Sequence, residues 1–249
     1  MKRFKAAIIH LSVSFVITCI AVIWVRYILY PNYFFDLSGG LKLLSLVVVV
    51  NLAIGPLLTL IIYNEKKTKK ALFFDLGTII FFQWVALVYG LYTIWLARPV
   101  YNVFVDDRFI IIRNIDLEQS NLEKAPPPYN RLPWVGGPKL VATNLPDDSD
   151  EKLSLAFSGM VGYDIEHYPQ YYVDYVSKKE YVLKKAKPII ELREKNGNAS
   201  RQVENFLKKW NGMAEDYYYL PIKGTAPEFM TVVLTKSGDP ITVLPIDPW

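Results

Sequence analysis

Three apolar stretches dominate the N-terminal part of the chain: Ala6–Tyr30 (AAIIHLSVSFVITCIAVIWVRYILY), Leu41–Tyr63 (LKLLSLVVVVNLAIGPLLTLIIY) and Ala71–Ala97 (ALFFDLGTIIFFQWVALVYGLYTIWLA). A helix rises about 1.5 Å per residue, so about 20 apolar residues cross the ~30 Å hydrocarbon layer of a bilayer. Each stretch is at least that long. The sequence therefore predicts a transmembrane region over residues 1–97, and residues 98–249 on one side of the lipid bilayer.

The basic residues around these stretches predict the orientation of the chain, because lysine and arginine near span ends prefer the cytoplasm. They precede the first span and fill the loop between the second and third, whereas residues 31–40 contain none. The residues concerned are Lys2, Arg3, Lys5, Lys66, Lys67, Lys69 and Lys70. We expect a multi-pass membrane protein with a cytoplasmic N-terminus and its C-terminal domain on the outer side. Short loops, no lipidation box and no sign of a disulfide scaffold fit the bacterial inner membrane, with this domain in the periplasm.

The first stretch could also be a cleaved signal peptide, since it has a basic start and an apolar core. Its core is long, however, and Val25-Arg26-Tyr27 offers no small-residue cleavage site, so we expect a retained anchor. The single cysteine, Cys19, lies within this stretch. No intramolecular disulfide can form, and the outer domain needs its own apolar core.

Charge divides unevenly along the chain. Residues 1–97 carry nine Lys and Arg against three Asp and Glu, a net +6, whereas residues 98–249 carry 19 against 21, a net −2. The overall charge of +4 therefore reflects topology signals and not a basic surface. We expect no nucleic-acid binding.

The second span contains small and polar residues on one face. Asn51, Gly55 and Thr59 are four residues apart and therefore share a helix stripe. Pro56 lacks a backbone donor, which frees the carbonyl near Leu52. Small residues let a second helix approach closely, and polar residues hydrogen-bond across the contact.

The third span repeats this pattern with Gln83, Ala86, Gly90 and Thr93. One interpretation is that spans two and three pack against each other through these stripes. The other is that part of the surface receives a helix from another protein. Both can hold, because three helices leave outward faces. We therefore predict a partner-helix docking site at Asn51, Gly55, Pro56, Thr59, Gln83, Ala86 and Gly90.

Two ionisable residues lie within the spans. His10 sits about one turn into the first, and Asp75 lies at the start of the third, close to the lysine loop. A proton relay needs such groups deep in the bilayer and paired. We interpret both as interfacial anchors and do not expect transport.

The outer domain begins with two expected strands, Val100–Val105 and Phe109–Arg113, around a polar turn at residues 106–108. Residues 118–150 are rich in proline and glycine and predict a long loop or extended arm, and the acidic run Asp147–Glu151 is interpreted as solvated loop.

The rest of the outer domain predicts helices and then strands. Ser177–Glu180 matches a capping box, followed by a helical stripe to Lys195 that Pro188 ends or bends. A short amphipathic helix follows, from about Ser200 to Trp210. Expected strands are Asp216–Ile222, Phe229–Thr235 and Ile241–Ile246. The predicted fold is three transmembrane α-helices followed by an α+β periplasmic domain with an antiparallel sheet.

Patterns of known catalytic and cofactor sites are not found. The sequence has no phosphate-binding glycine loop, no cysteine cluster and only one histidine outside the spans, His167. Carboxylates such as Asp107 and Glu166 are present without a recognised catalytic frame. We expect no enzyme activity, no cofactor and no metal.

The order and spacing of several short motifs resemble the TfpX/TfpZ family of type IV pilin accessory proteins. The resemblance covers the whole chain and is strongest to about residue 113. Its carriers in the spans are Tyr30-Pro31, Phe34-Phe35, Gly39-Gly40-Leu41, Gly55-Pro56-Leu57-Leu58-Thr59-Leu60, Phe74-Asp75-Leu76 and Tyr89-Gly90-Leu91-Tyr92. Those after the third span are Ala97-Arg98-Pro99-Val100-Tyr101, Asp107-Arg108-Phe109 and Asp247-Pro248-Trp249.

This resemblance implies an inner-membrane chaperone for a cognate type IV major pilin, without known catalysis and without defined active-site residues. A pilin precursor in the membrane has one apolar helix and a globular head, and a partner with a receptive helix face and an outer domain could contact both. The alternatives are a membrane-anchored sensor or regulator whose outer domain binds a small ligand, and a membrane-anchored hydrolase. The lysine loop is too short for an output domain, which counts against the sensor.

Overall fold

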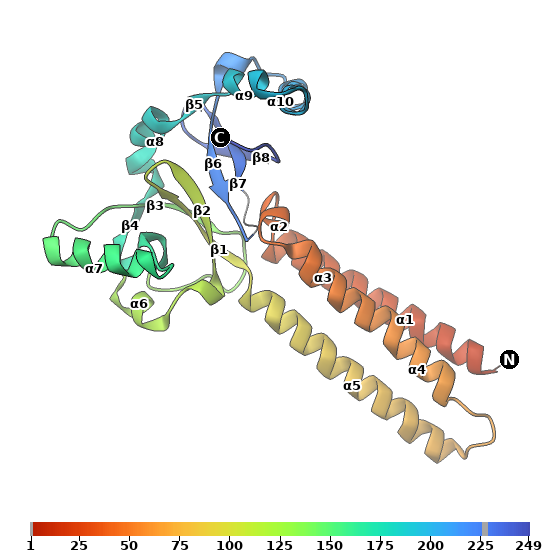
Figure 1. Ribbon diagram of the computed structural model, residues 1–249. Helices are drawn as coiled ribbons and strands as arrows, with labels where there is room; N and C mark the ends of the chain where they lie inside the picture. The colour runs from red at the N-terminus through yellow and green to blue at the C-terminus, as the bar shows by residue number, and fades with distance from the viewer. Residues whose placement is uncertain (1, 226–228) are drawn as a thin grey trace. The chain divides into compact units, whose positions relative to one another are not determined.

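The computed structural model describes residues 2–225 and 229–249. The chain divides into two compact units, Met1–Arg98 and Pro99–Trp249, a boundary one residue from the predicted one (Figure 1). The first unit is helical and the second contains a sheet with helices around it.

The helical unit contains three helices long and apolar enough to cross a membrane: Lys2–Leu29, Gly40–Ile62 and Lys69–Leu96. They match the three predicted stretches. The first consists of α1 (Lys2–Trp24) and the π-helical η1 (Val25–Leu29), and the short α2 (Phe34–Leu37) follows. The second consists of α3 (Gly40–Val49), the π-helical η2 (Val50–Ile54) and α4 (Gly55–Ile62), and the third is α5 (Lys69–Leu96).

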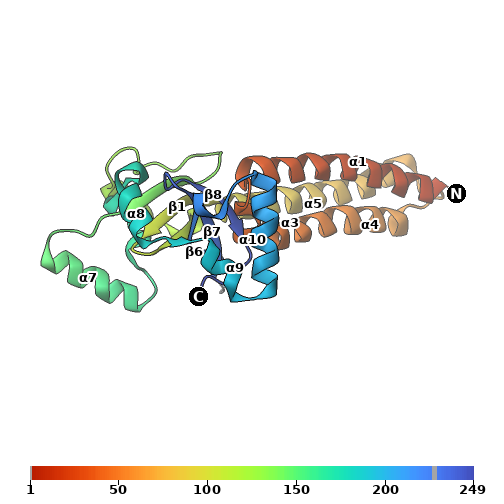
Figure 2. The ribbon, with the colours of Figure 1, turned by 90° about the horizontal axis from the view of Figure 1, so that it is seen from above.

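These helices lie side by side along most of their length (Figures 1 and 2). Toward one end they share an apolar cluster, within which the Tyr30 hydroxyl donates to the Ile94 carbonyl at 2.9 Å. Its buried members are Val25, Leu29, Tyr30, Phe35, Leu44, Val47, Leu87 and Ile94. Large apolar side chains such as Phe73 and Phe74 are exposed on the outside. Lipid-facing helices present such a surface.

The second unit is built on one sheet of eight strands within the described residues. They are β1 (Pro99–Val105), β2 (Arg108–Arg113), β3 (Lys139–Thr143), β4 (Tyr172–Asp174), β5 (Lys187–Pro188), β6 (Tyr217–Lys223), β7 (Phe229–Thr235) and β8 (Pro240–Leu244). The order is β4-β3-β1-β2-β6-β7-β8, and β5 pairs with β6. The strands predicted for β1, β2, β6, β7 and β8 are confirmed to within one or two residues.

The prediction of an antiparallel sheet is wrong, because the sheet is mixed. β3 pairs in parallel with β1, and β6 pairs in parallel with β2. Hairpin turns, which the sequence shows well, join neighbouring strands and force them to be antiparallel. The two parallel pairs are made across long connections instead, where the chain returns to the same end of the sheet before the next strand starts.

Helices and 3-10 turns complete this unit. The helices are α6 (Gln119–Lys124), α7 (Ser149–Met160), α8 (Lys179–Lys185), α9 (Ile190–Lys195) and α10 (Gly197–Trp210). The 3-10 turns are η3 (Asn114–Asp116), η4 (Ile165–His167), η5 (Pro169–Tyr171), η6 (Tyr175–Lys178) and η7 (Ala214–Asp216). The expected loop at residues 118–150 therefore contains α6, β3 and the start of α7. These are short elements between proline- and glycine-rich segments, where periodicity is a weak signal.

Two predictions about helix starts are also wrong. Ser177 does not cap a helix, because its hydroxyl donates to the Asp174 carbonyl at 2.6 Å while α8 begins at Lys179. The acidic run expected as solvated loop instead starts α7, where the Asp148 carboxylate accepts from the backbone N–H groups of Asp150 and Glu151, each at 2.9 Å. The predicted break at Pro188 is confirmed, since β5 separates α8 from α9.

Apolar clusters hold the described part of this unit together. One lies around β1 and β3 and includes Val100, Val103 and Tyr172. Another joins α9 and α10 to β6 and β7 and includes Leu192, Val203, Phe206 and Val233. The predicted amphipathic helix near Ser200–Trp210 is thus confirmed as α10, which begins at Gly197 after the Asn196 cap.

Glu166 is a buried carboxyl whose Oε2 atom has no hydrogen-bond partner among the described residues. Burial, with a further contribution from Asp164, raises its pKa above the ordinary value of 4.5. Because the folded pKa is the higher one, the contribution of this group to stability is fully present below the unfolded pKa and is lost as pH rises through the folded pKa.

We expect Glu166→Gln to remove this pH dependence. The free energy of unfolding of the variant should therefore rise relative to that of the wild type by an amount on the order of 1 kcal/mol as pH increases from 4 to 8. Thermal unfolding of the detergent-solubilised full chain across that range measures the difference. A difference in stability between the two proteins that stays constant across this pH range would contradict the assignment of the pH dependence to Glu166.

Candidate functional site

A network of polar side chains lies among the three long helices. The His10 ring is hydrogen-bonded on both sides, with Nδ1 2.6 Å from Thr59 Oγ1 and Nε2 2.8 Å from Gln83 Oε1. Since the Gln83 oxygen can only accept, His10 Nε2 donates to it. In the neutral ring Nδ1 then accepts from the Thr59 hydroxyl. The interpretation of His10 as an interfacial anchor is therefore wrong: it joins α1 to α4 and α5.

Gln83 occupies the centre of this network. Its Nε2 lies 2.9 Å from three acceptors, Ser14 Oγ, the Asn51 carbonyl and Asn51 Oδ1. Asn51 Nδ2 in turn donates to Thr18 Oγ1 at 3.2 Å. Because the amide nitrogen faces carbonyl oxygens, the amide oxygen is directed to His10. One side chain on α5 therefore binds both other long helices.

The bond to the Asn51 carbonyl follows from Pro56. In the π-helical register of η2, a backbone N–H pairs with the carbonyl five residues earlier, and Pro56 has no N–H to offer Asn51. The Gln83 amide donates to that carbonyl instead. The carbonyl predicted to be free near Leu52 is therefore that of Asn51, and the π turn, which the sequence does not reveal, determines which carbonyl it is.

Two glycines allow the close approach of these helices. A Cβ atom at Gly55 would overlap the Gln83 amide, and one at Gly90 would lie 2.8 Å from Val47 Cγ2. Of the predicted docking residues, Asn51, Gly55, Thr59 and Gln83 thus make contacts inside the unit. This agrees with the interpretation that the stripes pack spans two and three together, and docking of a partner helix stays a prediction.

Two hollows open beside the network. The first has a volume of about 350 Å³ and is lined mainly by α1 and α5, with Ile80 and Trp84 on its apolar walls and His10 and Gln83 among its polar lining. The second has a volume of about 280 Å³, lies between the second and third helices, and is lined by Ala86 and Gly90 among others. Predicted docking residues therefore line these hollows and also contact one another.

Sequence reasoning missed Ser14 and Thr18 as members of this network. His10, Ser14 and Thr18 are four residues apart, as are Asn51, Gly55 and Thr59. The same spacing rule would have found them. Asp75 lies where predicted, since its carboxylate forms an ion pair with Lys67 of the lysine loop at 2.5 Å.

The motif residues that follow the third helix make contacts within the fold of this protein. The Arg98 guanidinium donates to the Trp95 carbonyl at 2.7 Å and lies 4.2 Å from the centre of the Trp95 ring. Pro99 starts β1. Tyr101 is buried, its hydroxyl donates to the Tyr129 carbonyl at 3.3 Å, and burial raises its pKa to about 12.

Side-chain contacts on two sides stabilise the turn after β1. Asp106 adopts a left-handed conformation, with φ at 50°, and its carboxylate accepts from the Tyr181 hydroxyl at 3.0 Å. This bond and nearby Lys185 lower the Asp106 pKa. Asp107 pairs with Arg108 at 2.7 Å, and the Arg108 guanidinium lies 5.9 Å from the Trp249 ring.

The contact between Arg108 and Trp249 joins two of the motifs that carry the family resemblance, which are far apart in sequence. The spacing of the motifs alone did not show that they lie close together. Within residues 2–225 and 229–249, no three His, Cys, Asp or Glu side chains gather closely enough to hold a metal ion. The polar network of the helical unit is therefore the most distinctive candidate site.

We expect Gly55→Ala to destabilise the helical unit by about 1–3 kcal/mol, because the new Cβ displaces the Gln83 amide from its partners. Denaturant unfolding of the full chain in detergent measures this. Gly77→Ala is the matched control, because apart from the neighbouring backbone of its own helix no described atom lies within 4 Å of a Cβ at Gly77, and alanine is the better helix former. Equal stability of the two variants would show that the network does not depend on this contact.

Two curated relatives are similar to this chain over nearly all of its length, and a third over about half of it. The fimbrial assembly protein of serogroup E1 from Dichelobacter nodosus is 31% identical over 244 residues, which is 98% of this chain and 95% of the relative. The serogroup I protein from the same organism is 30% identical with the same coverage. The protein of serogroups C1 and C2 is 34% identical over 121 residues, 49% of this chain and 92% of the relative.

No protein-family model matches the chain, and no solved structure does. The two long matches include both the helical unit and the sheet unit. The chain therefore belongs to the family of the fimbrial assembly proteins.

Proposed function

We propose that this protein is an inner-membrane accessory factor of type IV pilus assembly, which binds its cognate major pilin and stabilises the subunit before or during incorporation into the pilus. The observation that carries the proposal is the similarity to fimbrial assembly proteins over 98% of the chain. The motifs shared with type IV pilin accessory proteins support the same role. The proposed role is binding and not catalysis.

The helical unit offers a way to bind a pilin inside the membrane. Helices associate in lipid through close packing and hydrogen bonds, since there is no water to expel. The hollow beside His10 and Gln83 combines apolar walls with polar groups, and both α1 and α5 border it. A pilin helix seated there could exchange hydrogen bonds with the network while its apolar side chains fill the hollow.

The separate sheet unit supports a second contact. In the proposed orientation it is periplasmic, on the same side as the globular head of a membrane-bound pilin. Two contacts on one tethered partner raise the effective concentration of each contact, so neither has to be strong.

Deletion of the protein tests the role as a whole. We expect fewer surface pili and less pilin in the membrane, because unescorted subunits are degraded or fail to be incorporated, and both should return when the wild-type protein is supplied. Electron microscopy and quantitative immunoblotting measure the two effects. Normal pilus number with normal pilin would remove the proposal.

Photocrosslinking in living cells tests the contact within the membrane. A photoreactive residue in place of Trp84, which lines the first hollow, should give an adduct that mass spectrometry identifies as pilin. Phe82 is the matched control, because it is 65% exposed on the same helix but two positions, about 200°, away from Trp84. Equal pilin yields at the two positions would show that the hollow is not the contact.

A further inference from the structure

The helix α7 carries a stripe of large apolar side chains that the protein does not cover. Leu153, Phe157, Met160 and the following Val161 are 57%, 62%, 82% and 75% exposed. They occupy positions i, i+4, i+7 and i+8, so they lie within about 100° of one another around the helix. A contiguous apolar stripe of this kind is typical of a helix that binds in a groove.

The opposite face of α7 is the one that attaches the helix to its unit. Leu155, about 200° from Leu153, is the buried residue of this helix. Glu151 accepts from the Tyr171 hydroxyl at 3.4 Å, and Gly159 faces the Asp164 carboxylate. These three residues fix which face is inward. The apolar stripe therefore points away from the unit, and Figure 2 shows α7 standing apart from the sheet.

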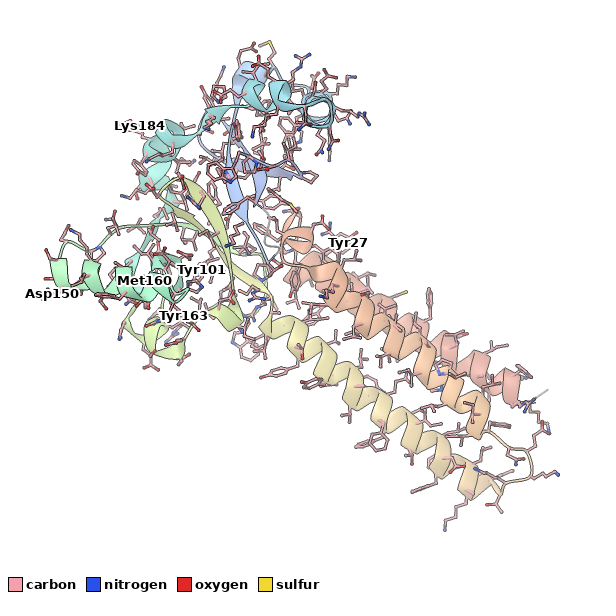
Figure 3. All side chains as sticks on the ribbon, in the orientation of Figure 1. Tyr27, Tyr101, Asp150, Met160, Tyr163 and Lys184 are labelled. Carbon is pink, nitrogen blue, oxygen red and sulfur yellow. The ribbon has the colours of Figure 1, made fainter. Side chains whose placement is uncertain are left out.

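The charges beside the stripe indicate what could cover it. Four carboxylates follow closely on one another in sequence at the N-terminal end of α7. Figure 3 labels Asp150 at this end, and Met160 and Tyr163 at the other. The four carboxylates are those of Asp147, Asp148, Asp150 and Glu151. Asp148 caps the helix and Glu151 lies on the inward face, so Asp150 is the carboxylate of α7 in line with the stripe. Lys152 is the one basic residue of the helix. A helix that lies on a membrane usually has a basic polar face, which anionic headgroups attract. The acidic end of α7 disfavours a lipid surface and favours a protein with a basic rim.

We propose that α7 is the docking helix for the globular head of the pilin. Leu153, Phe157 and Met160 enter an apolar groove on the head, and lysine or arginine side chains at one end of that groove face Asp150 and its neighbours. The inference rests on the proposed function, because it assigns the outer contact of the same partner.

Crosslinking from α7 in the full chain tests this contact. A photoreactive residue in place of Phe157 should yield a pilin adduct, whereas one in place of Val176, 64% exposed on the same unit, should not. Adducts of Phe157 with a second copy of this chain, or with lipid only, overturn the inference. A pilin adduct from Trp84 without one from Phe157 overturns it and leaves the proposed function standing. Absence of pilin from both positions counts against both.

Substitution tests the energetics. Phe157→Gln combined with Met160→Gln should reduce the pilin that co-purifies with the protein at least about tenfold, because exposed apolar anchors of this size dominate helix-in-groove contacts. Asp150→Lys should also weaken binding, and more so at low than at high salt. Protein level and thermal midpoint should stay at the wild-type value, as in the Val176→Gln control. Unchanged co-purification with both α7 variants overturns the inference.

Discussion

The three long helices are apolar enough to cross a membrane, and inside a bilayer no water would be available to satisfy their polar groups. The helical unit meets this constraint with hydrogen bonds between its own helices. Its central device is the Gln83 carboxamide, which binds His10, Ser14 and Asn51 at once. Pro56 exposes a backbone carbonyl, and the same amide satisfies it. Gly55 leaves the space that the amide occupies. The neighbouring residues Gly55 and Pro56 and the distant Gln83 thus act together to satisfy the polar groups between the helices.

The two units reverse each other's distribution of polar and apolar groups. The helical unit places polar groups inside and apolar side chains outside, an arrangement that suits lipid, whereas the sheet unit buries apolar clusters around β1 and around α10. The stripe on α7 departs from this second pattern. Exposed apolar side chains would cost nothing in lipid but are unfavourable in water, so a partner is proposed for the stripe on α7 and not for the apolar surface of α5.

How far the sequence predicts this structure depends on how local the signal is. The three spans and the β1–β2 hairpin are visible because each is determined by a run of neighbouring residues. The parallel pairing of β3 with β1 depends on where a long connection returns, which no local pattern records. His10 was misinterpreted because it was considered alone, although its spacing from Ser14 and Thr18 held the signal. The stripe of α7 was overlooked because an acidic run was interpreted as loop.

A protein that escorts a subunit must also release it, and the proposed contacts suit that need. Four apolar side chains on one short helix cover much less than the ~800 Å² per partner of a stable protein interface. A contact in the hollow beside Gln83 would gain only modest energy as well, since the network is already satisfied within the unit. Each contact alone is therefore weak, and only their connection through one chain makes them effective. Loss of either contact would lower the apparent affinity of the other and free the subunit.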